Sequence, residues 1–319
     1  MVKTRQMTRS KLALSELGLG CATLAVNASP EAVNDARAML HDALSNGINY
    51  FDTAPFYGRG LSERLVGDAL RKERKETSAT IVSSKSGRLL IPSSSASHHM
   101  PFQVVFDYTY DGIMKSVDHS YHRLGLSQID ILFAHDLGHH THADNAPFQF
   151  TTFMDGGGYR AMEELRNAGV VKAIGLGVNE IAICEQAMAY GSFDVFLLAG
   201  RYTLLERTAA LSFFERCAQA ETDIVIGGPF NSGMLVGGST YNYRAIPQHI
   251  ADQHRLLLNL CKKHSVEVGA AATQFPLRHN LVKSVIPGPK TRKELAQIVS
   301  WYSMDIPNNF WSELDSLSD

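Results

Sequence analysis

Residues 48–63 read INYFDTAPFYGRGLSE and combine a short strand, a loop and the beginning of a helix. Ile48, Tyr50 and Phe51 are bulky and β-favouring, which predicts a short buried strand. Pro55 and two glycines then interrupt the strand, and a helical pattern begins at Ser62. A carboxylate, Asp52, stands where the strand ends, and Tyr57 follows in the loop. Packing alone explains this pair poorly, so the loop is the first candidate functional segment.

The composition is that of an ordinary globular protein. The 319 residues are 45% hydrophobic and 19% charged, with a formal net charge of −2. This near-neutral balance gives no electrostatic reason to expect a nucleic-acid partner or an anionic membrane surface. No apolar run approaches the roughly 20 residues that span a bilayer, and the polar N-terminal residues do not resemble a signal peptide. Four widely spaced cysteines without a CxxC pair predict a reduced, cytoplasmic protein without a zinc site.

Strand-like and helix-like segments alternate along the whole chain. Apolar runs predict eight strands, at 17–21, 48–52, 80–85, 129–135, 171–177, 193–199, 223–227 and 282–287. Periodic segments predict helices at 30–46, 62–73, 107–124, 158–168, 180–190, 207–220, 248–263, 269–279, 291–302 and 307–316. Three longer connections are expected to be loops, at 88–106, 136–156 and 228–246.

Eight strand–helix units without a break in composition favour one α/β domain over residues 1–319, a (β/α)8 TIM barrel. The alternative is an open, doubly wound parallel sheet. Its glycine-rich fingerprint is only partly present at 18–23, where the third glycine is absent. We therefore expect a closed barrel whose active site lies at the C-terminal ends of the strands.

Four polar residues fall at the expected ends of three neighbouring strands: Asp52, Tyr57, Lys85 and His135. Each alone has an ordinary structural explanation, as a turn residue, a packed ring, a solvated cation or a buried histidine. Together they suit proton transfer. Tyrosine has an unperturbed pKa of about 10, and a neighbouring ammonium lowers that pKa. Asp52 would hold the lysine in place, and His135 would donate a hydrogen bond to a substrate oxygen.

The segment 50–63, followed by Lys85 and by His135-Asp136, resembles the aldo-keto reductase family, and the resemblance extends from about residue 9 to the C-terminus. It implies a (β/α)8 barrel that uses a nicotinamide cofactor without a Rossmann domain. The family's catalytic tetrad matches Asp52, Tyr57, Lys85 and His135. The interval from Lys85 to His135 is long for the family, which we attribute to 88–106. Other segments resemble a branch of L-fucose (D-threo-aldose) 1-dehydrogenases and a pyridoxal 4-dehydrogenase, at 89–92, 107–112, 198–205, 230–235 and 274–277.

The resemblance also implies cofactor-binding positions. Asn179 matches the asparagine that binds the nicotinamide carboxamide, although the usual serine before it is absent. The family's strand-6 glutamine falls on Ala199, and its stacking aromatic falls on Gly227. The loop over the pyrophosphate matches Gly228, Phe230 and Ser232. A phosphate site is expected where a helix N-terminus and cations attract anions, at Gly288, Lys290 and Thr291.

Glu294 bears on the choice of coenzyme. NADP-dependent members of the family have an arginine at this position, and an asparagine at Ile298. A carboxylate repels a 2′-phosphate and accepts a hydrogen bond from a 2′-hydroxyl. Lys290 and Arg292 remain able to meet a phosphate. We expect NAD rather than NADP.

Three functions stay open. The first is NAD(P)-dependent oxidation of an alcohol or lactol, such as L-fucose at C1 to its lactone. The second is oxidation of pyridoxal to 4-pyridoxolactone, and the third is a nucleotide-binding regulatory subunit with low turnover. A pocket lined by aromatic side chains would favour pyridoxal, whereas hydrogen-bonding side chains would favour a sugar. Candidate aromatic lining residues are Phe56, Tyr108, Phe148 and Phe150.

Histidines at 98–99 and 139–142 are expected to be mobile surface residues that hold no metal, and the oligomeric state is left open.

Overall fold

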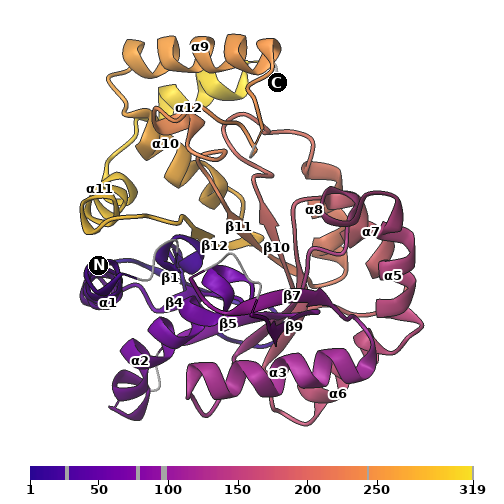
Figure 1. The fold of residues 1–319 in the computed structure, drawn as a ribbon. Coiled ribbons are helices and arrows are strands. Elements are labelled where there is room, and N and C mark those ends of the chain that lie inside the picture. The colour runs from indigo at the N-terminus through magenta and orange to yellow at the C-terminus, as the bar shows by residue number, and fades with distance from the viewer. Residues whose placement is uncertain (26–28, 77–79, 95–98, 243, 318–319) are drawn as a thin grey trace.

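The computed structural model describes residues 1–25, 29–76, 80–94, 99–242 and 244–317, and eight parallel strands form its centre (Figure 1). In sheet order the strands are β12 Val282–Ile286, β11 Asp223–Gly227, β10 Val195–Ala199, β9 Ala173–Val178, β8 Ile131–His135, β5 Ile81–Ser86, β4 Tyr50–Asp52 and β3 Leu19–Gly20. The last edge is joined by backbone hydrogen bonds from Gly18 to Val285 and from Gly20 to Pro287, both 2.9 Å. The predicted (β/α)8 barrel is confirmed.

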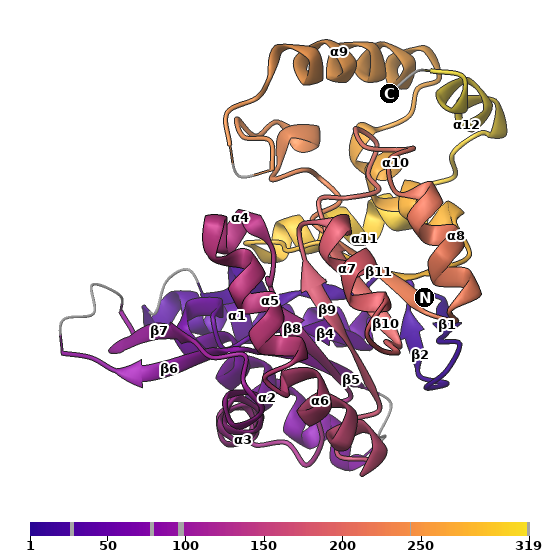
Figure 2. The same cartoon turned by 90° about the vertical axis from the view of Figure 1, so that its right-hand side faces the viewer.

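Helices surround this barrel (Figures 1 and 2). They are α1 Pro30–Ser45, α2 Leu61–Glu76, α3 Tyr110–Leu124, α6 Gly158–Asn167, α7 Ile181–Met188, α8 Leu211–Gln219, α10 Val268–Gln274 and α11 Arg292–Ser303. Two more, α9 Gln248–Lys263 and α12 Asn308–Asp315, lie together at one end of the molecule (Figure 1). None of the helices in the described part of the chain has the length and apolar character needed to cross a bilayer.

Two apolar cores explain why the strands were recognisable. Alternate residues of a strand point to opposite faces, so a barrel strand is buried both toward the interior and toward the helices. Phe133 and Leu197 belong to the interior core, whereas Leu132 and Phe196 pack in the outer one. Strands such as β10, Val195–Ala199, are consequently continuous hydrophobic runs.

A β-hairpin formed by β1 Thr4–Gln6 and β2 Ala13–Ser15 precedes the barrel and was not predicted. Met7 and Leu14 complete the interior core. Thr8 donates from its backbone N–H and its hydroxyl to the carboxylate of Asp223, at 2.6 and 2.8 Å. Because Asp223 begins β11, this hairpin covers the N-terminal end of the barrel, and a ligand reaches the interior from the opposite end.

The segment 88–106, expected to be a loop, contains a second antiparallel hairpin. β6 Arg88–Pro92 pairs with β7 Phe102–Phe106, with Arg88 opposite Phe106. Figure 2 shows it projecting from the side of the barrel. Its outer strand is partly exposed on both faces, so the sequence lacks the alternation that identifies a strand. His98 lies outside the described residues.

Smaller differences concern the ends of elements. The predicted loop 136–156 holds α4 His139–His142 and α5 Ala146–Met154. The helix expected at 207–220 begins only at Leu211, and the one at 269–279 becomes a 3₁₀ turn after Gln274. Within 228–246 the described residues include a short 3₁₀ helix, Met234–Val236, and an isolated antiparallel bridge between Tyr241 and Arg244.

Candidate active site

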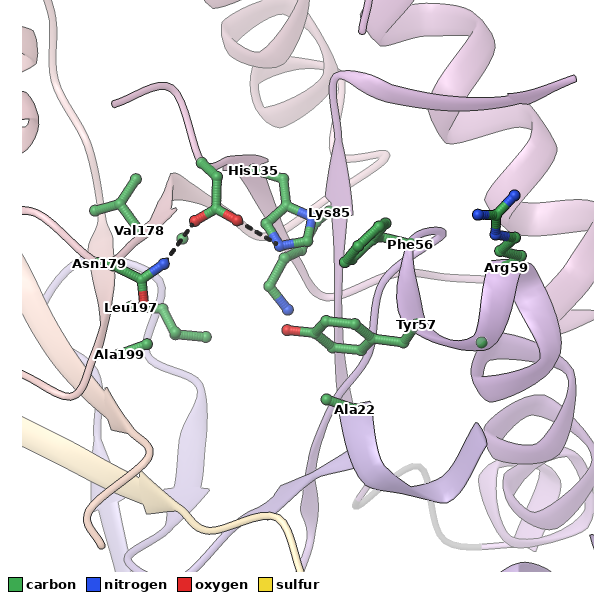
Figure 3. A pocket seen from close by; sticks show the side chains of 13 residues that line it. Ala22, Phe56, Tyr57, Arg59, Lys85, His135, Val178, Asn179, Leu197 and Ala199 are labelled. Carbon is green, nitrogen blue, oxygen red and sulfur yellow. Dashed lines mark hydrogen bonds and ion pairs between the residues drawn. The ribbon is translucent and has the colours of Figure 1, made fainter. Parts of the chain in front are cut away.

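A cavity of about 560 Å³ opens at the C-terminal ends of the barrel strands (Figure 3). It is lined by Ala22, Phe56, Tyr57, Gly58, Arg59, Lys85, His135, Asp136, Gly177, Val178, Asn179, Leu197 and Ala199. Three of the four predicted catalytic residues are among them. The fourth, Asp52, lies beneath, with only 2% of its surface exposed.

Asp52 and Lys85 form a buried ion pair between neighbouring strands. The Lys85 Nζ donates to both carboxylate oxygens of Asp52, at 2.9 and 2.7 Å, and to the backbone carbonyl of Thr53 at 2.9 Å. The Ser83 hydroxyl donates a further bond to Asp52, at 2.7 Å. All three ammonium donors are therefore used, which fixes the position of the charge.

Tyr57 lies directly over this ammonium. The Lys85 Nζ is 4.6 Å from the centroid of the Tyr57 ring, and the ring of His135 meets it edge-on at 5.8 Å. Figure 3 shows the Tyr57 hydroxyl pointing into the cavity beside the lysine. Gly58 and Arg59 adopt left-handed φ angles of 54° and 49°, which bend the loop back over the barrel.

Glu63, at the start of α2, anchors the loop to the scaffold, a role the sequence analysis did not assign. Its carboxylate is fully buried and accepts hydrogen bonds from the Ser84 hydroxyl on β5 and from the Arg123 guanidinium on α3. Ser62 beside it contacts the Thr53 hydroxyl at 2.8 Å. The same segment that carries Tyr57 is thus tied to the strand that carries Lys85.

His135 ends β8 and is neutral. Burial lowers the pKa of its imidazole well below the usual 6.5, and the cations of Arg88 and Lys85 act in the same direction. Its Nε2 lies 3.4 Å from an oxygen of Asp136, whereas its Nδ1 is buried without a partner among the described residues. We assign the proton to Nε2, because a protonated Nδ1 would be a buried donor without an acceptor.

The lowered pKa of His135 predicts a change in the pH dependence of stability. Below about pH 6.5 the unfolded chain takes up a proton at this position that the folded protein does not bind. The free energy of unfolding therefore decreases as the pH is lowered. For each pH unit below about 6.5, the free energy of unfolding of the wild type should fall by up to about 1.4 kcal/mol more than that of a His135→Asn variant. Urea unfolding at pH 7, 6 and 5 measures the difference, with His41→Asn on the surface of α1 as the control. Identical pH dependence of wild type and His135→Asn would contradict the assignment.

Asp136, the next residue, is a site residue that the sequence analysis did not single out. Its Oδ2 accepts a hydrogen bond from Arg88 at 2.5 Å, and its Oδ1 accepts one from Asn179 at 3.3 Å. Burial raises the pKa of Asp136, while Arg88 and Lys85 oppose that shift. Arg88 comes from the β6–β7 hairpin, which accounts for the omission. The adjacency of Asp136 to His135 was the only signal in the sequence.

The cavity wall near Asn179 contains residues with little or no side chain. Gly177 and Ala199 line it without a large side chain, and Asn179 places its amide beside them. Ala199, which departs from the family pattern, therefore leaves space in this wall, and Gly227, which does not line the cavity, provides no stacking ring. Phe230 does not compensate, because it lies outside the cavity lining and packs against Trp301, with ring centroids 5.7 Å apart.

The other predicted cofactor positions follow the last two strands, outside this cavity. Gly228 and Ser232 lie beyond β11, each with a φ of 59°. Gly288, Lys290, Thr291 and Glu294 surround the N-terminus of α11. The Thr291 hydroxyl caps the helix by accepting from the Glu294 N–H at 3.1 Å, and Glu294 accepts from the Lys290 N–H at 2.7 Å.

Arg292, which was a candidate phosphate ligand from the sequence, forms an ion pair in the structure. Its guanidinium donates to both oxygens of Asp42 on α1, at 2.6 and 3.0 Å.

Of the four aromatic residues proposed to line a pocket, only Phe56 does so. Tyr108 is buried and donates its hydroxyl proton to the His135 carbonyl at 2.6 Å, Phe150 packs against Tyr190, and Phe148 is 65% exposed. The rest of the lining is mixed. Six residues carry hydrogen-bonding side chains, Tyr57, Arg59, Lys85, His135, Asp136 and Asn179, and six are apolar or small, Ala22, Gly58, Gly177, Val178, Leu197 and Ala199.

The histidines of α4 lie at the surface, and none of them is buried. The backbone N–H groups of His139 and His140 donate to Glu180, and the His142 ring packs edge-on against Phe106 with centroids 4.6 Å apart. In the described part of the chain, no three metal-ligating side chains converge.

Comparison with known proteins agrees with this arrangement. Residues 16–319 match the aldo/keto reductase family. The chain is 39% identical to the pyridoxal 4-dehydrogenase of Microbacterium luteolum, across 98% of this chain and 96% of that one. It is 35% identical to the D-threo-aldose 1-dehydrogenase of a Pseudomonas species, across 95% and 94%.

Among solved structures, the aldo-keto reductase AKR11C1 of Bacillus halodurans, in its holo form, superposes with a TM-score of 0.76 at 23% identity, covering 98% of this chain and 96% of that one. This likeness shows the fold. The sequence relatives and the family match extend over nearly the whole chain, and aldo-keto reductases use NAD(P)(H). The protein is therefore an oxidoreductase that belongs to the aldo/keto reductase family.

Proposed function

We propose that the protein oxidises the hemiacetal carbon of a lactol, with an aldose such as L-fucose converted at C1 to its lactone. The observation that supports this choice is the cavity wall, where the carboxylate of Asp136 adds a hydrogen-bonding group beside Tyr57, Lys85 and His135. Hydroxyl-rich substrates need such groups, because each buried polar atom has to find a partner. Nicotinamide, when bound, supplies the acceptor for the hydride that leaves C1.

Each member of the tetrad has a distinct role in this proposal. Tyr57 takes the proton of the anomeric hydroxyl as general base, and the ammonium of Lys85 beneath its ring stabilises the phenolate. Asp52 holds that ammonium in place. His135, neutral and protonated on Nε2, donates a hydrogen bond to the reacting oxygen. The oxygen thus lies between two groups that move or stabilise charge as the hydride departs.

The cofactor would be held by residues that follow three of the last four strands, β9, β11 and β12. Asn179 would bind the carboxamide, and Gly228, Phe230 and Ser232 would surround the pyrophosphate. Gly288, Lys290 and Thr291 would meet a phosphate at the N-terminus of α11, where the helix dipole favours negative charge.

Pyridoxal is the second candidate, because its cyclic hemiacetal presents the same kind of reacting carbon. The Phe56 ring, 6.2 Å from the ring of His135, provides one aromatic surface against which a pyridine could pack. The M. luteolum relative, named for this activity, supports it as well.

A screen of reduced-nucleotide absorbance at 340 nm, with NAD and NADP against L-fucose, related aldoses and pyridoxal, tests both candidates. We expect turnover with an aldose. Turnover with pyridoxal alone would replace the first proposal by the second. Tight nucleotide binding without turnover on any substrate would instead support a regulatory subunit.

We further propose NAD as the preferred coenzyme. Glu294 places a carboxylate at the α11 N-terminus, and Arg292 is engaged by Asp42. A Glu294→Gln variant keeps the helix cap, since glutamine also accepts hydrogen bonds in this position. Its kcat/KM with NADP should rise about 5- to 10-fold, a change in binding free energy of about 1 kcal/mol at a charged contact. Unchanged kcat/KM values for both coenzymes would place Glu294 away from the 2′ position.

A further inference from the structure

We propose that Asp136 is the specificity-determining residue of this site and that its carboxylate accepts a hydrogen bond from the substrate hydroxyl next to the reacting carbon, the 2-hydroxyl of an aldose. The inference rests on the proposed function and refines it. It predicts which substrates are preferred: those with a hydroxyl beside the carbon that is oxidised.

The position of Asp136 makes it the first additional polar group that a substrate would meet. It lines the cavity, and its Oδ2 lies 3.4 Å from the Nε2 of His135, the atom proposed to bind the reacting oxygen. Figure 3 draws its interactions with His135 and Asn179 as dashed lines. A substrate oxygen bound to His135 would therefore have the carboxylate within reach of a hydroxyl on the neighbouring carbon.

The backbone and its neighbours hold Asp136 in this orientation. Its φ of 49° lies in the left-handed region, which is uncommon for a residue other than glycine and is concentrated at functional sites. Its backbone N–H donates to the carbonyl of Gly177 on the next strand at 2.9 Å. The side chain retains 16% exposure, so it is fixed but open to the cavity.

Arg88 holds the carboxylate from behind. Its guanidinium is only 5% exposed and lies over the rings of Phe56 and Phe106, at 4.5 and 5.4 Å from their centroids. It does not line the cavity, so it is a positioning residue. The β6–β7 hairpin, which begins at Arg88 and ends at Phe106, thus supplies the support for Asp136.

The carboxylate has acceptor capacity left for a ligand. An ionised carboxylate offers about four lone-pair sites, and the described contacts are those with Arg88, His135 and Asn179. A substrate hydroxyl can donate a hydrogen bond to this carboxylate. A deoxy substrate, which has a hydrogen atom in place of that hydroxyl, cannot. Sites built to bind a hydroxyl reject the analogue that lacks it much more strongly than apolar pockets reject an added group.

The test compares L-fucose with 2-deoxy-L-fucose in the wild type and in Asp136→Asn. The wild type should prefer L-fucose by about 10- to 100-fold in kcat/KM, the range expected for a hydrogen bond to a charged group. In Asp136→Asn that preference should shrink to about threefold or less. Because the measure is a ratio, general losses in folding, cofactor binding or catalysis cancel. If the wild type oxidises only pyridoxal, the inference is overturned, because the ring carbon next to the reacting carbon of pyridoxal carries no hydroxyl.

Asp194→Asn is the matched control, because Asp194 also pairs a buried carboxylate with an arginine, Arg166 at 3.0 Å, but at the other end of the barrel. It should lower stability and leave the substrate ratio unchanged. Calorimetric titration of both sugars into the NAD-loaded proteins gives the same ratio as dissociation constants, even without turnover. A wild-type preference that persists in Asp136→Asn, or a wild type without preference, overturns the inference; absence of turnover with a retained binding ratio overturns only the proposed reaction.

Discussion

Replacement of Tyr57 by phenylalanine is expected to reduce turnover by about 10²- to 10⁴-fold, the range in which a positioned acid–base group contributes. The variant loses one hydroxyl and keeps the ring that packs against His135 and over Lys85. Nucleotide affinity and the free energy of unfolding should therefore change little. Steady-state rates at 340 nm, a fluorescence titration of the nucleotide and urea unfolding together separate these three quantities.

Tyr110→Phe is the control for this experiment. Tyr110 also loses a hydroxyl that is hydrogen-bonded, to Glu164 at 2.6 Å, but it lies on the surface of α3. Its turnover should match the wild type. Near-normal turnover of Tyr57→Phe would show that another group moves the proton.

The second large effect concerns the buried ion pair. Lys85→Met should cost about 3–5 kcal/mol of unfolding free energy, because it leaves the Asp52 carboxylate buried without its cation. It should also remove activity, since no cation remains beneath Tyr57. The double variant Asp52→Asn with Lys85→Met has no buried charge at this place. Its free energy of unfolding should exceed that of Lys85→Met by at least about 2 kcal/mol, because replacing both members of a buried ion pair by neutral groups often changes stability little.

Urea unfolding and turnover of the two single variants and the double variant complete this cycle. Stability should recover in the double variant while activity does not. A fully stable Lys85→Met protein, or a double variant less stable than both singles, would argue that the pair is not the electrostatic unit described above.

The barrel could be predicted because most of its strands can be recognised from a few consecutive residues. Segments such as 131–134 and 195–199 are buried on both faces, so a run of four or five consecutive apolar residues identifies each one. The two hairpins were missed for the opposite reason. Residues 102–106 are partly exposed on both faces, and 4–6 and 13–15 are too short to show a period.

The candidate site divides in the same way. Asp52 ends β4 and Tyr57 lies in the loop that follows it, while Lys85 and His135 lie near the ends of recognisable strands, so their positions follow from the barrel itself. Asp136 depends on Arg88, 48 residues earlier, and on the hairpin that positions it. Glu63 depends on Arg123, 60 residues later. Pairings of this kind are set by tertiary packing, and a single sequence contains no local pattern that identifies them.

The most direct test of the central proposal follows the hydride itself. L-fucose carrying deuterium at C1 is incubated with the protein and NAD, and the reduced nucleotide is examined by NMR. We predict deuterium at C4 of the nicotinamide, in equal amount to the lactone formed, and none when Tyr57→Phe replaces the wild type over the same period. Reduced nucleotide that carries no label, or label released to water, would contradict hydride transfer from C1 at this site.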